Sequence, residues 1–212
     1  MLRIAITGGI ACGKTYVGRY LSFKGVAVWE ADEAAHDLLQ NDEKIHKKVV
    51  KHFGIKIIDG TGKINRGMLG DIVFADRDAR QFLNNLMHPV INSQMQKWLE
   101  EKEKHGTLIA AAIIPLLYEA RIDNKRWDAV VCVACHNNIQ YDRMKQRGMS
   151  DKDIANRLAS QWPIERKVEL ADIVLVNNGT GWDLEGQVDS MLKRINKRMK
   201  YERETTTFGT SY

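Results

Sequence analysis

The chain has 212 residues, 44% hydrophobic and 28% charged, which is an ordinary globular composition with enough apolar material for one core with insertions. Its three cysteines are too few for a disulfide framework, no apolar run reaches membrane-spanning length, and the N-terminal residues lack a signal-peptide pattern, so we expect a cytoplasmic protein. The net charge of +5 and the pI near 9.0 suit an anionic ligand, but they fit a nucleotide and a nucleic acid equally well.

The chain opens with a glycine-rich loop between a predicted strand and a predicted helix. The apolar run Arg3–Thr7 reads as a short buried strand, and apolar residues at helical spacing follow the loop. Glycines let backbone N–H groups curl around phosphate oxygens, and the start of the helix adds partial positive charge. Lys14 would reach the β- and γ-phosphates, and the Thr15 hydroxyl would bind Mg²⁺. A nucleoside triphosphate site is predicted, because the pattern G-x-x-x-x-G-K-[ST] is matched by Gly8, Gly13, Lys14 and Thr15.

A second predicted strand, Val26–Trp29, runs directly into Glu30-Ala31-Asp32. This places Asp32 at the carboxyl edge of the sheet, where ligands bind in open α/β folds. A carboxylate there can orient an acceptor hydroxyl and take its proton during phosphoryl transfer. Asp32 is equally suited to capping the next helix, and the two roles are compatible.

The residues from about Asp42 to His105 are too many for a single crossover helix and contain several helical patterns. An insertion of this size beside a phosphate site usually forms the wall for a second substrate. Three more buried strands are predicted after it, and together the five runs indicate an α/β domain with a doubly wound parallel sheet. These later strands are Thr107–Ile114, Asp128–Cys135 and Ile173–Val176.

Cys132 and Cys135 form a C-x-x-C pattern inside the fourth predicted strand. A zinc site would need a second pair of ligands, and only His136 lies nearby in the sequence. Residues three apart in a strand point to opposite faces of the sheet, so we interpret both cysteines as buried strand residues rather than a metal or redox site.

Two helices are predicted between the fourth and fifth strands. Ile139–Arg147 forms the first, and Ser150 with Asp153 makes a capping box for the second, which runs to about Gln161. The basic side chains of this segment suggest a lid that closes on a triphosphate, although a solvated basic face would look the same. These side chains are Arg143, Lys145, Arg147, Arg157, Arg166 and Lys167.

The last predicted helix runs from about Trp182 to Lys200, and we expect the polar tail after it to fray. The predicted organisation is a core (1–41, 106–138 and 168–200), a helical substrate-binding insertion (42–105), a lid (139–167) and a tail (201–212).

In this order the motifs resemble those of the dephospho-CoA kinase family, over nearly the whole chain. The resemblance implies a P-loop nucleoside-triphosphate hydrolase-like kinase fold, with a five-stranded parallel sheet flanked by helices. It rests on the phosphate loop, Glu30-Ala31-Asp32, Leu86-Met87-His88-Pro89, Ile114-Pro115-Leu116-Leu117-Tyr118-Glu119 and Ala171-Asp172 to Asn177-Asn178-Gly179.

The resemblance also implies the reaction, which is transfer of the ATP γ-phosphate, with Mg²⁺, to the ribose 3′-hydroxyl of dephospho-CoA. This is the last step of coenzyme A synthesis. The implied catalytic residues are Asp32, Lys14 and Arg143. The implied ATP-binding residues are Gly8, Gly9, Ala11, Cys12, Gly13, Lys14, Thr15, Tyr16, Arg143, Arg147 and Asn177. The implied dephospho-CoA residues are Asp32, Arg66, His88, Leu116, Leu117 and Glu119, and the implied Mg²⁺ ligand is Thr15.

The chain departs from the family's usual pattern at a few positions. Ala11-Cys12 replaces Gly-Ser, Tyr16 replaces Thr, and Glu30 replaces Asp. Ile113 stands where some members place an acid, so no second strand-borne Mg²⁺ carboxylate is visible there. Two orientations of Cys12 stay open: a reactive thiol exposed in the empty loop, or an inert one tucked against the sheet.

Three other functions fit the sequence less well. A nucleoside or nucleoside-monophosphate kinase would share the core and the lid, but the long insertion with its His-Pro element speaks against it. A GTP-binding switch needs N-K-x-D, and the nearest string, Asn124-Lys125-Arg126-Trp127, has Trp in place of Asp. A nucleic-acid-binding ATPase would need aromatic residues interleaved on a basic strand face, which the sequence lacks. We therefore expect ATP and dephospho-CoA as small-molecule partners, with no nucleic acid or membrane.

Overall fold

In the computed structural model, residues 1–122 and 126–208 are described, with side chains up to residue 197. Five strands form one sheet in the order β2-β3-β1-β4-β5, and every neighbouring pair is parallel. Each strand lies within one residue or two of the run predicted for it, which confirms the doubly wound parallel sheet. The strands are β1 (Leu2–Gly8), β2 (Ala27–Glu30), β3 (Ile109–Ile113), β4 (Ala129–Ala134) and β5 (Ile173–Val176).

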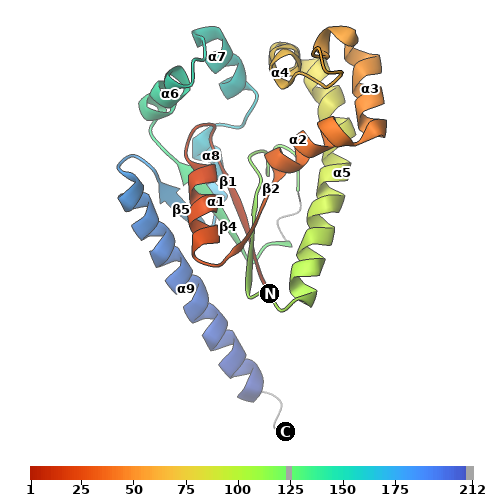
Figure 1. Cartoon of the computed structure of the whole chain (residues 1–212). Helices are drawn as coiled ribbons and strands as arrows, with labels where there is room; N and C mark the ends of the chain where they lie inside the picture. The colour runs from red at the N-terminus through yellow and green to blue at the C-terminus, as the bar shows by residue number, and fades with distance from the viewer. Residues whose placement is uncertain (123–125, 209–212) are drawn as a thin grey trace.

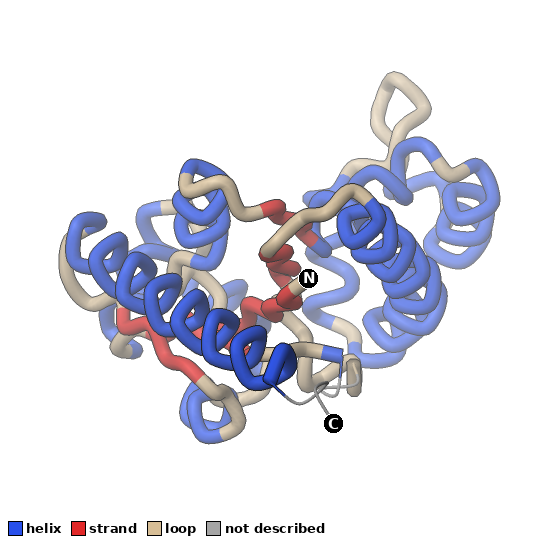
Figure 2. Tube along the Cα trace, turned by 90° about the horizontal axis from the view of Figure 1, so that it is seen from below, coloured by secondary structure: helices blue, strands red, loops and turns tan. Residues whose placement is uncertain are grey.

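Helices cover both faces of this sheet (Figures 1 and 2). On one face, α1 (Lys14–Phe23) and α9 (Gly181–Phe208) bury apolar side chains against β1 and β4. On the other face, the second half of α5 (Arg77–Lys104) packs on β3, and α8 (Ile164–Glu169) contacts β1 and β4. Burial on both faces explains why the strands are near-continuous apolar runs in the sequence.

The insertion after β2 has a small core of its own, to which its helices and the first half of α5 contribute. Figure 1 shows these helices beyond one end of the sheet, with the two lid helices beyond the same end. Helix α2 (Ala31–Asn41) precedes the predicted insertion, which itself begins with α3 (Glu43–Phe53), η1 (Ile55–Ile57) and α4 (Arg66–Ala75). The lid contains α6 (Asn137–Gln146) and α7 (Asp151–Ala159).

The capping box predicted for the second lid helix is confirmed. The backbone N–H of Asp153 donates to Ser150 Oγ at 3.2 Å, and Ser150 Oγ donates to the Asp153 carboxylate at 2.6 Å. Helix α7 also reaches the insertion, because the Arg157 guanidinium lies 4.2 Å from the centre of the Phe74 ring on α4. Lid and insertion therefore touch through a cation–π contact.

Two expectations need correction. Helix α9 extends to Phe208, eight residues beyond its predicted end at Lys200, and residues 209–212 lie outside the described part of the chain. Asp32 does not cap α2, because Glu30 is the N-cap residue and Asp32 lies in the first helical turn. Asn124 and Lys125, the first two residues of the string nearest to the N-K-x-D guanine motif, also lie outside the described residues.

Candidate active site

The phosphate loop joins β1 to α1, and two of its glycines have conformations that a larger residue would not tolerate. Gly8 has φ 143°, and a Cβ added there would lie 2.1 Å from the carbonyl oxygen of Val133. Gly13 has φ 106°, and its Cβ would lie 2.3 Å from Asn177 Nδ2. Gly13 is also the N-cap of α1, with no side chain capping the helix. The first N–H groups of α1 are therefore not satisfied by a capping side chain, which suits a phosphate group.

Lys14 points back across this loop. Its Nζ donates hydrogen bonds to the carbonyl oxygens of Gly8 at 3.1 Å and Gly9 at 2.8 Å. Burial is the largest influence on Lys14 and lowers its pKa, while the carboxylate of Asp32 acts in the opposite direction. The carbonyl oxygens of Gly8 and Gly9 thus hold the Lys14 ammonium within the phosphate loop, where it can meet a bound phosphate.

Three loop residues differ in exposure and in partners. The Thr15 side chain is exposed in the first turn of α1, next to Lys14. Tyr16 is exposed as well, and its hydroxyl donates to Glu185 on α9 at 2.6 Å. Ala11 is buried and has φ 57°, a left-handed conformation that favours glycine. The replacement of Gly by Ala at position 11 therefore leaves a strained residue in the phosphate loop.

The structure decides between the two orientations of Cys12. Its side chain is fully buried, and its Sγ lies 3.3 Å from Cys135 Sγ at the end of β4. The exposed orientation is therefore wrong, and the tucked one is confirmed. Cys135 packs in the core under α1 and α9, whereas Cys132 lies near Lys167 on the other face, as the strand alternation predicted. Burial raises the pKa of Cys132 to about 12.

Asn177, which follows β5, connects the lid to the phosphate loop. Its side-chain Nδ2 donates to the carbonyl oxygen of Cys12 at 2.9 Å. The guanidinium of Arg143 on α6 donates to Asn177 O at 3.1 Å and to Asn177 Oδ1 at 3.2 Å, and more weakly to Ala11 O at 3.4 Å. Arg147 is exposed at the C-cap of α6. Arg143 and Asn177 thus lie on the phosphate loop, while Arg147 lies one helical turn further along the lid.

Sequence reasoning missed Gln140, which also lies on α6. Its side chain is buried, and Nε2 donates to the carbonyl oxygen of Ile10 in the phosphate loop at 2.7 Å. A glutamine one turn before Arg143 belongs to the same helix face, and this spacing was the available signal.

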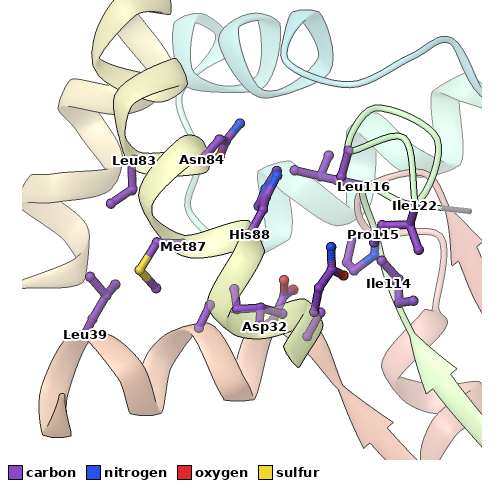
Figure 3. Close-up of a pocket in the computed structure, with 15 residues that line it drawn as sticks. Asp32, Leu39, Leu83, Asn84, Met87, His88, Ile114, Pro115, Leu116 and Ile122 are labelled. Carbon is purple, nitrogen blue, oxygen red and sulfur yellow. The ribbon is translucent and has the colours of Figure 1, made fainter. Parts of the chain in front are cut away.

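A pocket of ≈ 180 Å³ lies between α2, α5 and the segment after β3. Figure 3 shows the Asp32 carboxylate from α2, the His88 imidazole from α5 and the Leu116 side chain around the same space. Most of the remaining lining is apolar. Burial lowers the pKa of His88, which favours its neutral imidazole.

Two further polar residues of this pocket, Asn84 and Asn92, were not identified from the sequence. Together with His88 they recur every four residues along α5, so one face of this helix supplies all three side chains. The four-residue spacing was visible in the sequence, but the sequence did not show that this face of α5 lies opposite α2 and the segment after β3.

Three predicted substrate residues do not line the pocket. Leu117 is fully buried in the core below it. Glu119 forms an ion pair with Lys167 on α8, with 2.7 Å between Oε1 and Nζ. Arg66 is exposed at the first position of α4. The structure therefore gathers Asp32 and His88, with Leu116, and leaves the other three apart.

A parallel α/β sheet with a glycine-rich loop before α1, a carboxylate after the second strand and a helical lid defines a P-loop kinase. Within the described part of the chain, no helix is both long and apolar enough to cross a membrane. The family model described as dephospho-CoA kinase matches residues 2–183. The chain belongs to the dephospho-CoA kinase family.

Individual relatives agree with this assignment. The dephospho-CoA kinase of Geobacillus kaustophilus is 36% identical, over 91% of this chain and 96% of the relative. That of Arabidopsis thaliana is 34% identical, over 93% of this chain and 85% of the relative. Among solved structures, the dephospho-CoA kinase from Campylobacter jejuni superposes with a TM-score of 0.67 at 26% identity, covering 92% of this chain and 97% of the other. The protein TT1252 from Thermus thermophilus gives a TM-score of 0.73 at 28% identity, covering 91% and 97%.

Proposed function

We propose that this chain transfers the γ-phosphoryl group of ATP to the ribose 3′-hydroxyl of dephospho-CoA, completing coenzyme A synthesis. One observation carries the proposal beyond family membership. Asp32 lines the apolar pocket and is also close enough to Lys14 to act on its pKa. The Asp32 carboxylate, which is suited to an acceptor hydroxyl, therefore lies near the Lys14 ammonium, which is suited to a migrating phosphoryl group.

The phosphate loop would bind the triphosphate through its backbone N–H groups, at the uncapped start of α1. Lys14 would leave the carbonyl oxygens of Gly8 and Gly9 and follow the γ-phosphoryl group. Arg143 already lies on the loop, where it can neutralise charge that develops on the phosphates. Asn177 would fix the adjoining loop for the adenine end of ATP.

Asp32 would accept the proton of the attacking hydroxyl from its position in the first turn of α2. The neutral His88 would donate or accept one hydrogen bond to the acceptor, and Leu116 would contact its apolar parts. Leu117 and Glu119 are proposed to act only indirectly, by holding the segment after β3 that lines the pocket. Arg66, exposed at the start of α4, is proposed to contact dephospho-CoA only outside this pocket.

The residues present fit a Mg²⁺ ion held chiefly by phosphates and water. Among the side chains described, those of residues 1–122 and 126–197, no group of three or more His, Cys, Asp or Glu is placed to hold a metal. Thr15 offers an exposed hydroxyl beside Lys14. When bound, the ion would neutralise charge on the β- and γ-phosphates.

The test is direct. The purified chain is incubated with ATP, Mg²⁺ and dephospho-CoA, and the products are separated by chromatography and identified by mass. We expect coenzyme A, formed far faster than AMP, CMP or adenosine is phosphorylated. Comparable turnover of any of those three would favour a nucleoside or nucleoside-monophosphate kinase. Lys14→Ala serves as the control for activity from a contaminant, because its turnover should fall by orders of magnitude.

A further inference from the structure

Two thiols from distant parts of the chain meet beneath the phosphate loop. Cys12 Sγ and Cys135 Sγ are 3.3 Å apart, and both cysteines are free. Cys12 belongs to the loop itself, whereas Cys135 follows the last residue of β4. Cys12 is fully buried and Cys135 is 6% exposed, so Cys135 is the more accessible of the two.

Cationic side chains of the active site flank this pair. The Arg143 guanidinium lies close enough to Cys135 to lower its thiol pKa, against the larger effect of burial, which raises it. Cys12 lies close enough to Lys14 to raise the pKa of the Lys14 ammonium, against the larger effect of burial, which lowers it. Because burial dominates at Cys135, the thiol is its resting form, and its oxidation will be slower than that of an exposed cysteine.

We propose that Cys12 and Cys135 are a disulfide-forming modification site, through which a peroxide reversibly inactivates the phosphate loop. Cys135 attacks one peroxide oxygen as thiolate, the O–O bond breaks, and a sulfenic acid forms as hydroxide leaves. Cys12 then attacks this sulfur as thiolate, the S–S bond forms, and the S–O bond breaks with loss of a second hydroxide. The two thiol protons convert both hydroxides to water, so two thiols are oxidised and one peroxide is reduced.

The modification would distort the loop because the two sulfurs must approach to about 2.05 Å. Cys135 directly follows β4, which pairs on both sides with β1 and β5, so Cys135 has little freedom to move. The shift therefore falls on Cys12, whose carbonyl oxygen holds Asn177 and whose Sγ lies against Gly9. A misplacement of about 1 Å in a catalytic constellation can reduce the rate by about 10²-fold. We expect a loss of that order.

Cys132, which lies in β4 itself, provides the control. It is fully buried and lies on the opposite face of the sheet, near Lys167. It therefore cannot reach Cys12, although only two residues separate it from Cys135.

The experiment treats the full-length reduced chain with hydrogen peroxide, quenches it with an alkylating agent, and maps its peptides by mass spectrometry without reduction. We expect a Cys12–Cys135 cross-link with Cys132 alkylated only after denaturation, and turnover lowered about 10²-fold. Dithiothreitol should remove the cross-link and restore turnover together. A map that shows no such cross-link, or a cross-link to Cys132 or between two chains, would overturn the proposal.

Two variants separate the disulfide from general oxidative damage. Cys135→Ala should keep its own untreated turnover after peroxide, and Cys132→Ala should lose turnover as the parent chain does. Equal sensitivity of Cys135→Ala would refute the role of the pair. Should Cys135→Ala not fold, the peptide map of the unsubstituted chain decides alone. That map does not depend on the substrate, so the outcome is independent of the proposed kinase reaction.

Discussion

At the scale of single residues, Ala11 is the clearest compromise in the chain. It has a left-handed φ of 57° and is buried in the phosphate loop. For residues other than glycine this conformation costs about 1–2 kcal/mol.

Ala11→Gly should therefore stabilise the protein, by about 0.5–1 kcal/mol, because relief of the strain outweighs the extra backbone entropy of glycine in the unfolded chain. Chemical denaturation with urea measures the change. Ala155→Gly, in the exposed interior of α7, is the control of opposite sign, with an expected loss of about 1 kcal/mol. A loss at both positions would mean that Ala11 is not strained.

The second prediction for a single residue concerns Asp32. Asp32→Asn keeps size and shape but removes the charge and most of the basicity, so turnover should fall by about 10²–10⁴-fold with ATP affinity little changed. Glu33→Gln, the exposed neighbour in the same helical turn, is the matched control and should retain full turnover. Near-normal turnover of a folded Asp32→Asn chain would leave Asp32 with no role beyond the stability of α2.

At the scale of elements, the lid helix α6 combines a residue already on the phosphate loop with residues that face solvent. Arg143 contacts Ala11 and Asn177, while Arg147 is exposed at the end of the helix. Lys145 lies between them and forms an exposed ion pair with Asp151 at 3.1 Å. The three positions therefore test whether the basic charge of α6 acts on phosphate or only on water.

Arg143→Ala should lower kcat by about 10²-fold and weaken ATP binding less, since its contacts tighten as charge develops. Arg147→Ala should act in the same direction with a smaller effect, because it reaches the phosphates only when the lid closes. Lys145→Ala should change neither constant. Steady-state kinetics with ATP titrations would distinguish these cases, and unchanged kinetics in all three variants would reduce α6 to a solvated basic surface.

At the scale of the whole molecule, a buried ion pair links the acceptor side of the active site to the base of the lid. Lys167 on α8 is fully buried, and its Nζ contacts Glu119 Oε1 at 2.7 Å and Pro115 O at 2.8 Å. Glu119 Oε1 also accepts the backbone N–H of Trp162, just before α8, at 2.8 Å. The segment after β3 that lines the acceptor pocket is thus tied to the segment on which the lid is mounted.

Lys167→Met should lower the free energy of unfolding by about 3–5 kcal/mol, because it leaves the Glu119 carboxylate buried without its partner. Adding Glu119→Gln should recover part of that loss. Lys47→Met breaks the exposed pair with Glu43 on α3 and should cause no measurable change. Denaturant midpoints compare the three proteins, and similar midpoints for Lys167→Met and the parent chain would show that the pair is not structurally important.

The sheet and the phosphate loop were predictable because their signals are local. Buried parallel strands are continuous apolar runs, and the loop needs glycine at Gly8 and Gly13 for backbone reasons alone. The Cys12–Cys135 contact and the Gln140–Ile10 hydrogen bond were not predictable, since each depends on the packing of segments more than a hundred residues apart. Exposure of Arg66 and burial of Leu117 are decided in the same way, by neighbours that the sequence does not identify.

The position of β1 in the sheet also bears on how the protein is made. Although β1 is the first strand of the chain, it lies in the middle of the sheet, where Ile4 pairs with Ala111 on one side and with Ala129 on the other. In a nascent chain that ends before Ala129, β1 lacks its partner β4. The ATP site therefore cannot assemble progressively from the N-terminus. Such long-range parallel pairing slows folding, and one side of this apolar strand stays unpaired until β4 has been made. The segment that carries the chemistry is therefore the one with the longest wait for its partners, and the one that most needs protection from aggregation during synthesis.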